Sequence, residues 1–483
     1  MQQLNRSLVE NKKYTERILQ FGEGNFLRAF ADWMIDRMNK QVSYDSGVVV
    51  VQPIEQGLGD LLNQQEGLYN LYLNGLKGGE AVRERYLIDC ITRCLNPYSD
   101  FEAYLQTATQ PEMRLVISNT TEAGITFSEA DKADDTPPAT FPAKLTAWLY
   151  RRYQHFSAAP DKGMILIPCE LIDRNGDKLR ETILQYAESW QLEAGFADWV
   201  QQHNTFCNTL VDRIVPGYPK DRMKEITSEL GYQDKLVAEG EHFHLWVIEG
   251  PEEVKKAFPA AKAGLNVVFT TDQSPYRTRK VRILNGAHTS MVPVGYLYGL
   301  HTVRETVEHP VVGGFVRRCI FKEIISTLDL PEDELLRFAK DVTDRFRNPF
   351  VKHFLLSISL NSFSKYRTRV LPSVLEYQKR SGQFPEMLVL SLGALIFFYK
   401  GERNGEAIPL KDDAPVLELM ASLWEQQGNG HLDFAGMAEK VLAFESVWGQ
   451  DLNHIHDLHG ELTFWLQEID RKGVVEILRE RLR

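Results

Sequence analysis

Three polar side chains that could carry a proton transfer, Lys280, Asn285 and His288, stand five and then three residues apart in the segment YRTRKVRILNGAHTSM. At about 100° per residue they fall within an arc of about 140° on one α-helix, so all three can share a face. A desolvated lysine can take the proton of an alcohol near neutral pH. An asparagine amide can donate to a developing alkoxide, and a histidine can bind a substrate hydroxyl or assist the proton transfer. Together they predict carbonyl and alcohol redox chemistry, although Lys280 by itself would more often be a solvated surface residue.

A glycine turn near the N-terminus offers a place for a redox cofactor. The segment ILQFGEGNFLRAF predicts a strand, a tight turn and a helix, and Gly22 and Gly24 match the first two glycines of the pattern G-x-G-x-x-G. Leu27 stands in the third place. Glycines at such a turn let a pyrophosphate approach the backbone, and Arg28 is placed to meet a phosphate. A turn without a ligand and a solvated Arg28 are the alternatives, but the location in the first strand-to-helix crossing favours a dinucleotide.

The end of the second expected strand bears on the choice of cofactor. In dinucleotide-binding folds an acidic residue there usually binds the ribose. The segment VVVVQPIE offers Gln52 at that place and Glu55 slightly later, and it contains no arginine to hold a 2′-phosphate. NAD is therefore favoured over NADP.

The elements that must position these residues change character along the chain. Continuous apolar runs predict buried parallel strands, and they alternate with amphipathic helices such as 25–40 and 141–156. After about residue 275 the pattern becomes helical, with expected helices that include 277–300, 332–346 and 349–361. We expect an α/β Rossmann-type domain with a mainly parallel sheet over 1–275 and an all-α domain over 276–483.

Composition narrows the class of protein. The net charge of -11 and pI of about 5.7 argue against nucleic-acid and anionic-membrane partners. The longest apolar run, 387–399, is too short to span a bilayer, and the N-terminus lacks the apolar core of a signal peptide. The five cysteines have no CxxC spacing, which favours free thiols in a reducing cytoplasm. The three histidines of HIHDLH lack a fitting fourth ligand, so we expect no metal.

Several of these segments together resemble one family. The pattern K-x-R-x-L-N-x-x-H at 280–288, FGEGNFLRAF at 21–30, the segment VDRIVP and the segment RFRNP resemble the mannitol dehydrogenase family of polyol-specific long-chain dehydrogenases. The resemblance extends over essentially the whole chain. It implies a metal-free, NAD-dependent enzyme with a Rossmann-type first domain and a helical second domain.

The resemblance also implies roles for individual residues. Lys280 would be the general acid/base, Asn285 would stabilise the oxyanion, and His288 would contact substrate hydroxyls. Asp212 and Arg213 would orient catalytic groups, with a buried pair that only holds the fold as an equal alternative. The cofactor-binding residues would be Ile18, Leu19, Gln20, Phe21, Gly22, Glu23, Gly24, Asn25, Phe26, Leu27, Arg28 and Ala29.

One departure from the family pattern concerns the oxyanion. Mannitol and fructuronate enzymes carry SCDN where this chain has PCEL at 168–171, and Leu171 cannot replace their asparagine in polarising a carbonyl. Either Asn175 compensates, or Asn285 acts alone. The departure also points away from fructuronate as the substrate.

Clustered cations in the helical half suit a substrate carboxylate, which calls for a positioned arginine or lysine. The resemblance implies a keto-hexuronate or its aldonate as the small-molecule substrate, and we expect it to contact Asp212, Arg345 and Lys365. Surface solvation is the alternative for any one cation. Fructuronate or a mannitol-type polyol is the first alternative substrate, and a catalytically inactive nucleotide-binding protein is the second alternative. The further cations in the two segments DRFRNP and SKYRTR are Arg347, Arg367 and Arg369.

Overall fold

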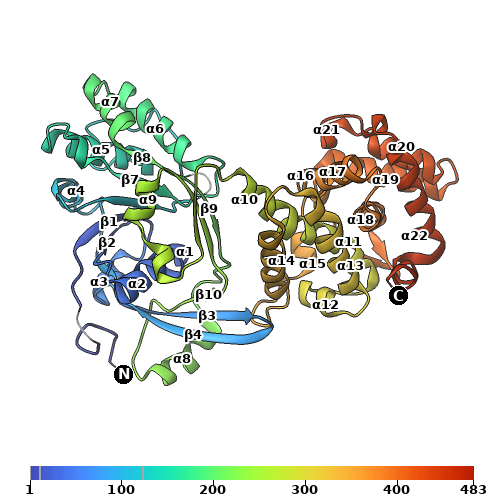
Figure 1. Cartoon of the computed structure of the whole chain (residues 1–483), viewed down its shortest axis with the longest axis horizontal. Coiled ribbons are helices and arrows are strands. Elements are labelled where there is room, and N and C mark those ends of the chain that lie inside the picture. The colour runs from blue at the N-terminus through green and yellow to red at the C-terminus, as the bar shows by residue number, and fades with distance from the viewer. Residues whose placement is uncertain (1, 10–11, 122–123, 483) are drawn as a thin grey trace. The chain divides into compact units, whose positions relative to one another are not determined.

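A computed structural model describes residues 2–9, 12–121 and 124–482. Its internal contacts divide the chain into two units (Figure 1). The first comprises Met1–Asn74 and Ala81–Gln273, and the second comprises Gly75–Glu80 and Ser274–Arg483.

The first unit is built on a six-stranded parallel sheet with the order β5-β2-β1-β6-β7-β8. Register aligns the carboxyl ends of its central strands, because Phe21 pairs with Val51 and with Ser118, and Ser118 pairs with Pro168. The residues that follow these strands therefore share one edge of the sheet, where open α/β folds bind their ligands. The strands are β1 Glu16–Phe21, β2 Gly47–Val51, β5 Ile91–Leu95, β6 Leu115–Ser118, β7 Ile165–Pro168 and β8 Thr205–Phe206.

Helices cover both faces of this sheet. Alternate strand residues point to opposite sides, so Ile18 belongs to the core formed with α2, while Leu19 belongs to the core formed with α5 and α6. All five residues of β2 are buried, as the run GVVVV predicts. The α/β prediction for the first part of the chain is confirmed. The helices are α1 Asn25–Ala29, α2 Ala31–Val42, α3 Gly59–Gln64, α4 Phe101–Gln106, α5 Phe141–His155, α6 Asn175–Ser189, α7 Ala194–His203, α8 Met223–Leu230 and α9 Glu252–Ala257.

The single helix expected over 25–40 is wrong, because the chain breaks at Phe30. Phe30 has φ -125° and ψ -79°, and it separates α1 from α2. Its ring packs against Phe26 and Trp246, with centroids 5.0 and 5.2 Å away. Packing of this aromatic side chain accompanies the break.

Two three-stranded sheets complete the strands of this region. One has the order β10-β3-β4, and the other has the order β12-β11-β9, with β11 antiparallel to β9 and parallel to β12. The strands are β3 Tyr69–Lys77, β4 Glu80–Ile88, β9 Asn208–Asp212, β10 Ala238–Glu241, β11 Leu245–Glu249 and β12 Val267–Thr270.

The second unit is helical, as predicted, and two π-helices interrupt its α-helices. The π-helices are Lys280–Gly286 and Cys319–Ile324. Apolar α18 is buried and packs against α11 and α22. The α-helices are α10 Ser274–Arg279, α11 Ala287–Tyr298, α12 Val303–Glu308, α13 Val312–Arg318, α14 Glu332–Phe346, α15 Leu355–Ile358, α16 Ser362–Arg369, α17 Leu371–Ser381, α18 Glu386–Phe398, α19 Ala414–Gly428, α20 Phe434–Leu442, α21 Glu445–Trp448 and α22 Leu458–Arg481, and the short strands are β13 Glu402–Arg403 and β14 Glu406–Ala407.

Two expectations about helices meet different outcomes here. The helix expected over 332–346 has those bounds, whereas the one expected over 349–361 is mostly wrong, since only Leu355–Ile358 is helical. Phe350 and Phe354 are 48% and 51% exposed, so their apolar character does not mark a buried helix face. Within the described part of the chain, no helix combines the length and the apolar character that crossing a bilayer requires.

Candidate active site

The two glycines of the turn after β1 serve different ends. Gly22 has φ +115°, and a Cβ there would lie 2.8 Å from the carbonyl oxygen of Asn119, so only glycine fits. Gly24 has φ -66°, and a Cβ on it would meet nothing within 4 Å. Gly22 is therefore required by the fold, whereas Gly24 leaves open space at the ligand-binding edge of the sheet.

The remaining positions of the turn are filled from within the unit. Leu27, in the place of the third glycine, is 1% exposed and packs beneath the turn near Gly22. Glu23 is buried, and its Oε1 accepts the backbone N–H of Leu58 at 3.3 Å. Burial raises the pKa of Glu23. The loop after β2 is thus tied to the glycine turn.

Arg28 is engaged within its own unit, and its role at a phosphate stays a prediction. Its guanidinium is 2% exposed and donates to the carbonyl of Glu23 at 3.1 Å, to Oδ1 of Asn25 at 2.6 Å and to the carbonyl of Leu236. It also lies 5.1 Å from the ring centre of Tyr69. Arg28 therefore holds the turn to the rest of its own unit.

Gln52 is also engaged inside the protein. Its Nε2 donates to the carbonyls of Ile54 and Glu55, both at 2.8 Å, and its Oε1 accepts the N–H of Gly59 at 3.0 Å. Gln52 thus shapes the loop after β2. Glu55 is exposed, and the sequence from 52 to 59 contains no cation.

The structure bears on the two alternatives for the asparagine that the family pattern has at position 171. Asn175 is fully buried, and its amide nitrogen donates to the carbonyls of Pro168 and Glu170, each at 3.1 Å. These bonds tie Asn175 to its own turn, which favours the alternative in which Asn285 acts alone. Leu171 is 63% exposed beyond β7.

Asp212 and Arg213 are both buried at the end of β9. Arg213 donates to the carbonyl of Ala29 at 2.6 Å and to that of Phe243 at 3.0 Å, and it lies 4.2 Å from the ring centre of Trp33. These contacts match the alternative in which Arg213 holds the fold. The role of Asp212 in substrate binding stays a prediction.

The predicted catalytic residues of the second unit lie on and beside the first π-helix. Lys280 is its first residue and Asn285 its sixth. Because a π-helix pairs residue i with residue i+5, these two stand one turn apart on one face. The prediction of a shared face had assumed an α-helix, and the π-helix brings the pair into closer register. Asn285 is partly exposed, and its amide makes no hydrogen bond among the described residues.

His288 follows on α11 and lies at the centre of a basic cluster. Its ring contacts those of Phe346 and His353, with centroids 4.5 and 5.1 Å away. Burial lowers its pKa well below the ordinary value, and the positive charges of His353, Arg345, Arg369 and Lys365 add to the effect. The imidazole is therefore neutral at neutral pH. Its Nε2 is buried and has no hydrogen-bond partner among the described residues.

The cations of this cluster differ in how they are neutralised. Lys365 donates to the carbonyl of Ile358 at 2.8 Å, and Asp412 acts on it electrostatically. Arg369 is half-buried, and burial lowers its pKa without a compensating carboxylate among the described residues. A half-buried arginine without a counter-ion is suited to bind an anion.

The structure thus brings Lys280, Asn285, His288, Arg345 and Lys365 into one unit and places the glycine turn in the other. Sequence reasoning missed His353. Its only signal was its place four residues after the RFRNP segment.

These features define a class of protein: a Rossmann-type sheet with a glycine turn, followed by a helical unit with a lysine, an asparagine and a histidine in register. The chain matches the mannitol dehydrogenase Rossmann domain over residues 16–261 and the mannitol dehydrogenase C-terminal domain over residues 272–470. The chain therefore belongs to the mannitol dehydrogenase family.

Several known proteins are similar to this chain over nearly its full length. An altronate oxidoreductase of Bacillus subtilis is 49% identical over 481 residues, covering 99% of this chain and 98% of the relative. One from Escherichia coli O7:K1 is 49% identical over 480 residues, covering 99% of each. Among solved structures, D-sorbitol dehydrogenase in substrate-free form has a TM-score of 0.80 at 21% identity, over 98% of this chain and 99% of the other. Pseudomonas fluorescens mannitol 2-dehydrogenase, in a ternary complex with NAD and D-mannitol, has a TM-score of 0.64 at 24% identity, over 97% and 95%.

Proposed function

We propose that this chain is an NAD-dependent oxidoreductase that interconverts D-tagaturonate and D-altronate. The observation that carries the proposal is the half-buried Arg369, which has no counter-ion among the described residues and lies in one cluster with Arg345, Lys365 and a neutral His288. Such a group suits a substrate that has both hydroxyls and a carboxylate, as sugar acids do. The near full-length similarity to altronate oxidoreductases supports this substrate.

The residues of the second unit have separate roles in the proposed reaction. In the direction of reduction, Lys280 gives a proton to the carbonyl oxygen of the substrate, and in oxidation it takes that proton back. The amide of Asn285 donates to the same oxygen as negative charge develops there. His288, as a neutral imidazole, hydrogen-bonds a substrate hydroxyl, and Arg369 binds the carboxylate with help from Arg345 and Lys365.

The first unit fits a dinucleotide. Open space at Gly24 leaves room for a pyrophosphate, and Gly22 holds the turn that creates it. The loop from 52 to 59 offers no cation for a 2′-phosphate and exposes Glu55, which would repel one, so NAD is preferred over NADP. When bound, the cofactor supplies or accepts the hydride at the reacting carbon.

Turnover tests this proposal. The purified protein is offered NADH with tagaturonate, fructuronate or fructose, and NADPH is tested in parallel. We expect rapid loss of NADH absorbance with tagaturonate and much slower loss with the other substrates or with NADPH. Preference for fructuronate or fructose would overturn the substrate, and no turnover of any would favour a nucleotide-binding protein without activity.

A variant tests the role of Lys280. Replacing Lys280→Ala removes the proton donor, so we expect kcat to fall by about a hundredfold or more while binding of NADH is retained. Lys340→Ala is the matched control, because Lys340 is an exposed lysine of the same unit, on α14. If Lys280→Ala keeps nearly full turnover, the proposed general acid/base is wrong.

A further inference from the structure

A buried carboxylate lies at the carboxyl edge of the parallel sheet of the first unit. Glu170 stands two residues beyond β7 and is 2% exposed. Its Oε2 accepts the hydroxyl of Ser118 at 3.0 Å, and its Oε1 accepts both the backbone N–H and the hydroxyl of Thr120, each at 3.1 Å. Burial raises its pKa, and no cation offsets this within the part of the chain that the structure describes. A carboxylate is costly to bury, so three donors on one short segment indicate that it holds that segment in place.

The backbone joins β6 to β7 without this carboxylate. Ser118 and Pro168 form the last residue pair of the two strands, and the N–H of Cys169 donates to the carbonyl of Ser118 at 2.7 Å. Thr120 lies beyond these pairs, so the bonds from its N–H and its hydroxyl fix a stretch of backbone that strand pairing does not reach. Glu170 therefore serves the segment after β6 more than the pairing of the strands.

The segment that the carboxylate fixes, residues 118–120, borders the glycine turn. Asn119 at its centre donates its backbone N–H to the carbonyl of Phe21 at 3.0 Å and its side-chain amide to the carbonyl of Cys169 at 2.8 Å. The carbonyl oxygen of Asn119 is also the atom that lies 2.8 Å from a Cβ built on Gly22. The carboxylate holds the residues on both sides of Asn119, so it controls how closely this carbonyl approaches the turn.

The strand order connects this border with ligand binding. From β1 the sheet continues through β2 and β5 on one side and through β6, β7 and β8 on the other, so the strand order reverses between β1 and β6. Open α/β folds bind dinucleotides in the crevice outside the carboxyl ends of the strands at such a switch point. The glycine turn follows β1 and the segment 118–120 includes the end of β6, so these two segments flank the switch point.

We propose that Glu170 is a positioning residue of the cofactor site, which holds the segment 118–120 beside the glycine turn and so shapes the crevice for a dinucleotide. The inference rests on the proposed function, because that function places NADH at this edge of the sheet. Glu170 acts through Ser118 and Thr120 and does not itself need to touch the cofactor. Loss of its hydrogen bonds should weaken cofactor binding, whereas a carboxylate that only stabilises the fold would affect unfolding alone.

Binding of NADH to the full-length protein, followed by the fluorescence of the cofactor, is the experiment, and thermal unfolding is measured in parallel. Glu170→Leu nearly keeps the size of the side chain and removes both oxygens, so we expect the Kd of NADH to rise by about fivefold or more. Glu170→Gln keeps an acceptor for Thr120 and a polar atom for Ser118, so its Kd should stay within about twofold of the original value.

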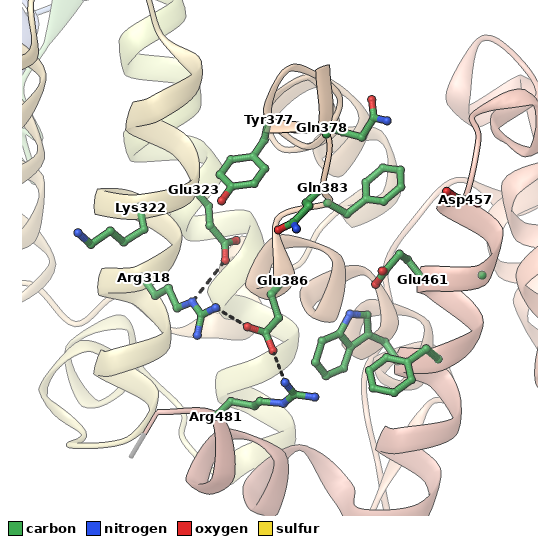
Figure 2. A pocket seen from close by; sticks show the side chains of 15 residues that line it. Arg318, Lys322, Glu323, Tyr377, Gln378, Gln383, Glu386, Asp457, Glu461 and Arg481 are labelled. Carbon is green, nitrogen blue, oxygen red and sulfur yellow. Dashed lines mark hydrogen bonds and ion pairs between the residues drawn. The ribbon is translucent and has the colours of Figure 1, made fainter. Parts of the chain in front are cut away.

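Glu323 provides the matched control. It is a buried glutamate of the second unit, 3% exposed, and it accepts the backbone N–H groups of Met387 and Leu388 at 3.0 and 2.9 Å. Figure 2 shows its carboxylate beside Arg318, with which it pairs at 3.7 Å. Glu323→Leu should lower the unfolding midpoint and leave the Kd of NADH unchanged, because its bonds hold the start of α18 and not the glycine turn.

If thermal unfolding shows that Glu170→Leu does not fold, Ser118→Ala decides the question. Ser118 is 1% exposed and donates its hydroxyl to Glu170, so this variant removes one of the three bonds and should raise the Kd of NADH about two- to threefold. An unchanged Kd in both variants, or an equal rise in Glu170→Gln or in Glu323→Leu, would overturn the positioning role alone. A rise in Kd without turnover of any sugar acid would support this role and overturn the proposed substrate. Failure of the unmodified protein to bind NADH would overturn both.

Discussion

The carbonyl oxygen of Arg369 lies 3.0 Å from the point where a Cβ on residue 286 would stand, so the end of α16 approaches the π-helix this closely because residue 286 is glycine. Arg369 is the half-buried cation of the basic cluster, and Gly286 directly follows Asn285. The absence of one side chain thus sets the spacing between the proposed carboxylate anchor and the proposed oxyanion donor.

Replacing Gly286→Ala should therefore impair substrate binding more than folding. The new methyl group forces the end of α16 outward by a few tenths of an ångström, and small displacements of positioning groups are costly for catalysis. We expect kcat/KM for tagaturonate to fall by about tenfold with little change in the midpoint of thermal unfolding. Gly428→Ala is the control, because a Cβ there meets nothing within 4 Å. Equal kinetics for the two variants would contradict this reading.

Arg369→Met tests the anion site directly. Hydrogen bonds to charged groups are worth about 1.5–3 kcal/mol, so loss of this contact should raise KM for the sugar acid on the order of tenfold to a hundredfold. KM for NADH should stay the same, and Arg369→Lys should recover part of the loss. Steady-state kinetics with each substrate varied in turn measure both values.

A neighbouring arginine provides the control for that experiment. Arg367 is on the same helix, but it is exposed and donates to the carbonyl of Val447 at 3.0 Å. Arg367→Met should leave KM for the sugar acid near its original value. An equal effect of both substitutions would show that general positive charge, and not Arg369, attracts the substrate.

The fold could be predicted where local pattern and burial agree. The run GVVVV gave a strand buried on both faces, and the amphipathic pattern of 332–346 gave the bounds of α14. The prediction was wrong where apolar residues serve another purpose. Phe30 breaks a helix to pack against Trp246, a strand residue far along the chain. Phe354 is exposed, although it stands in a segment with a helical pattern.

The candidate site shows the same limit. Lys280, Asn285 and His288 are close in sequence, so their shared face could be predicted, but the π-helix that improves their register has no simple sequence signal. The internal contacts of Arg28 could not be predicted, because one of them is with the carbonyl of Leu236, a residue distant in the sequence. Whether a cation has a counter-ion is likewise a property of the fold, which is why Arg369 could be singled out only from the structure.

The two glycines of the turn should respond in opposite ways to alanine. Residue 24 has a φ that alanine can adopt, and a Cβ there meets no neighbour, so the thermal stability of Gly24→Ala should be unchanged. The added methyl group takes up space needed by the cofactor, so KM for NADH should rise. Gly22→Ala has φ +115° and a carbonyl at 2.8 Å, so it should lower the unfolding midpoint. Calorimetry and NADH titration separate the two effects. A loss of stability in Gly24→Ala without a change in NADH binding would argue against the cofactor site.

His288 should make stability depend on pH in a defined direction. Burial and nearby positive charges, among them Arg345, Arg369 and Lys365, lower its pKa in the folded state, whereas the unfolded chain has an ordinary histidine pKa of about 6.5. Below that pH the unfolded state binds a proton that the folded state does not, so the contribution of a neutral His288 is present above about pH 6.5 and is lost as pH falls. His288→Gln removes this titration. Between about pH 7 and pH 5 we expect the free energy of unfolding of the unmodified protein to fall relative to that of His288→Gln, by at most about 1.4 kcal/mol per pH unit. The unfolding midpoints of the two proteins should diverge accordingly. His454→Gln, at an exposed position, is the control. If the difference in stability between the unmodified protein and His288→Gln stays constant over this range, His288 takes up a proton in the folded state and the prediction is wrong.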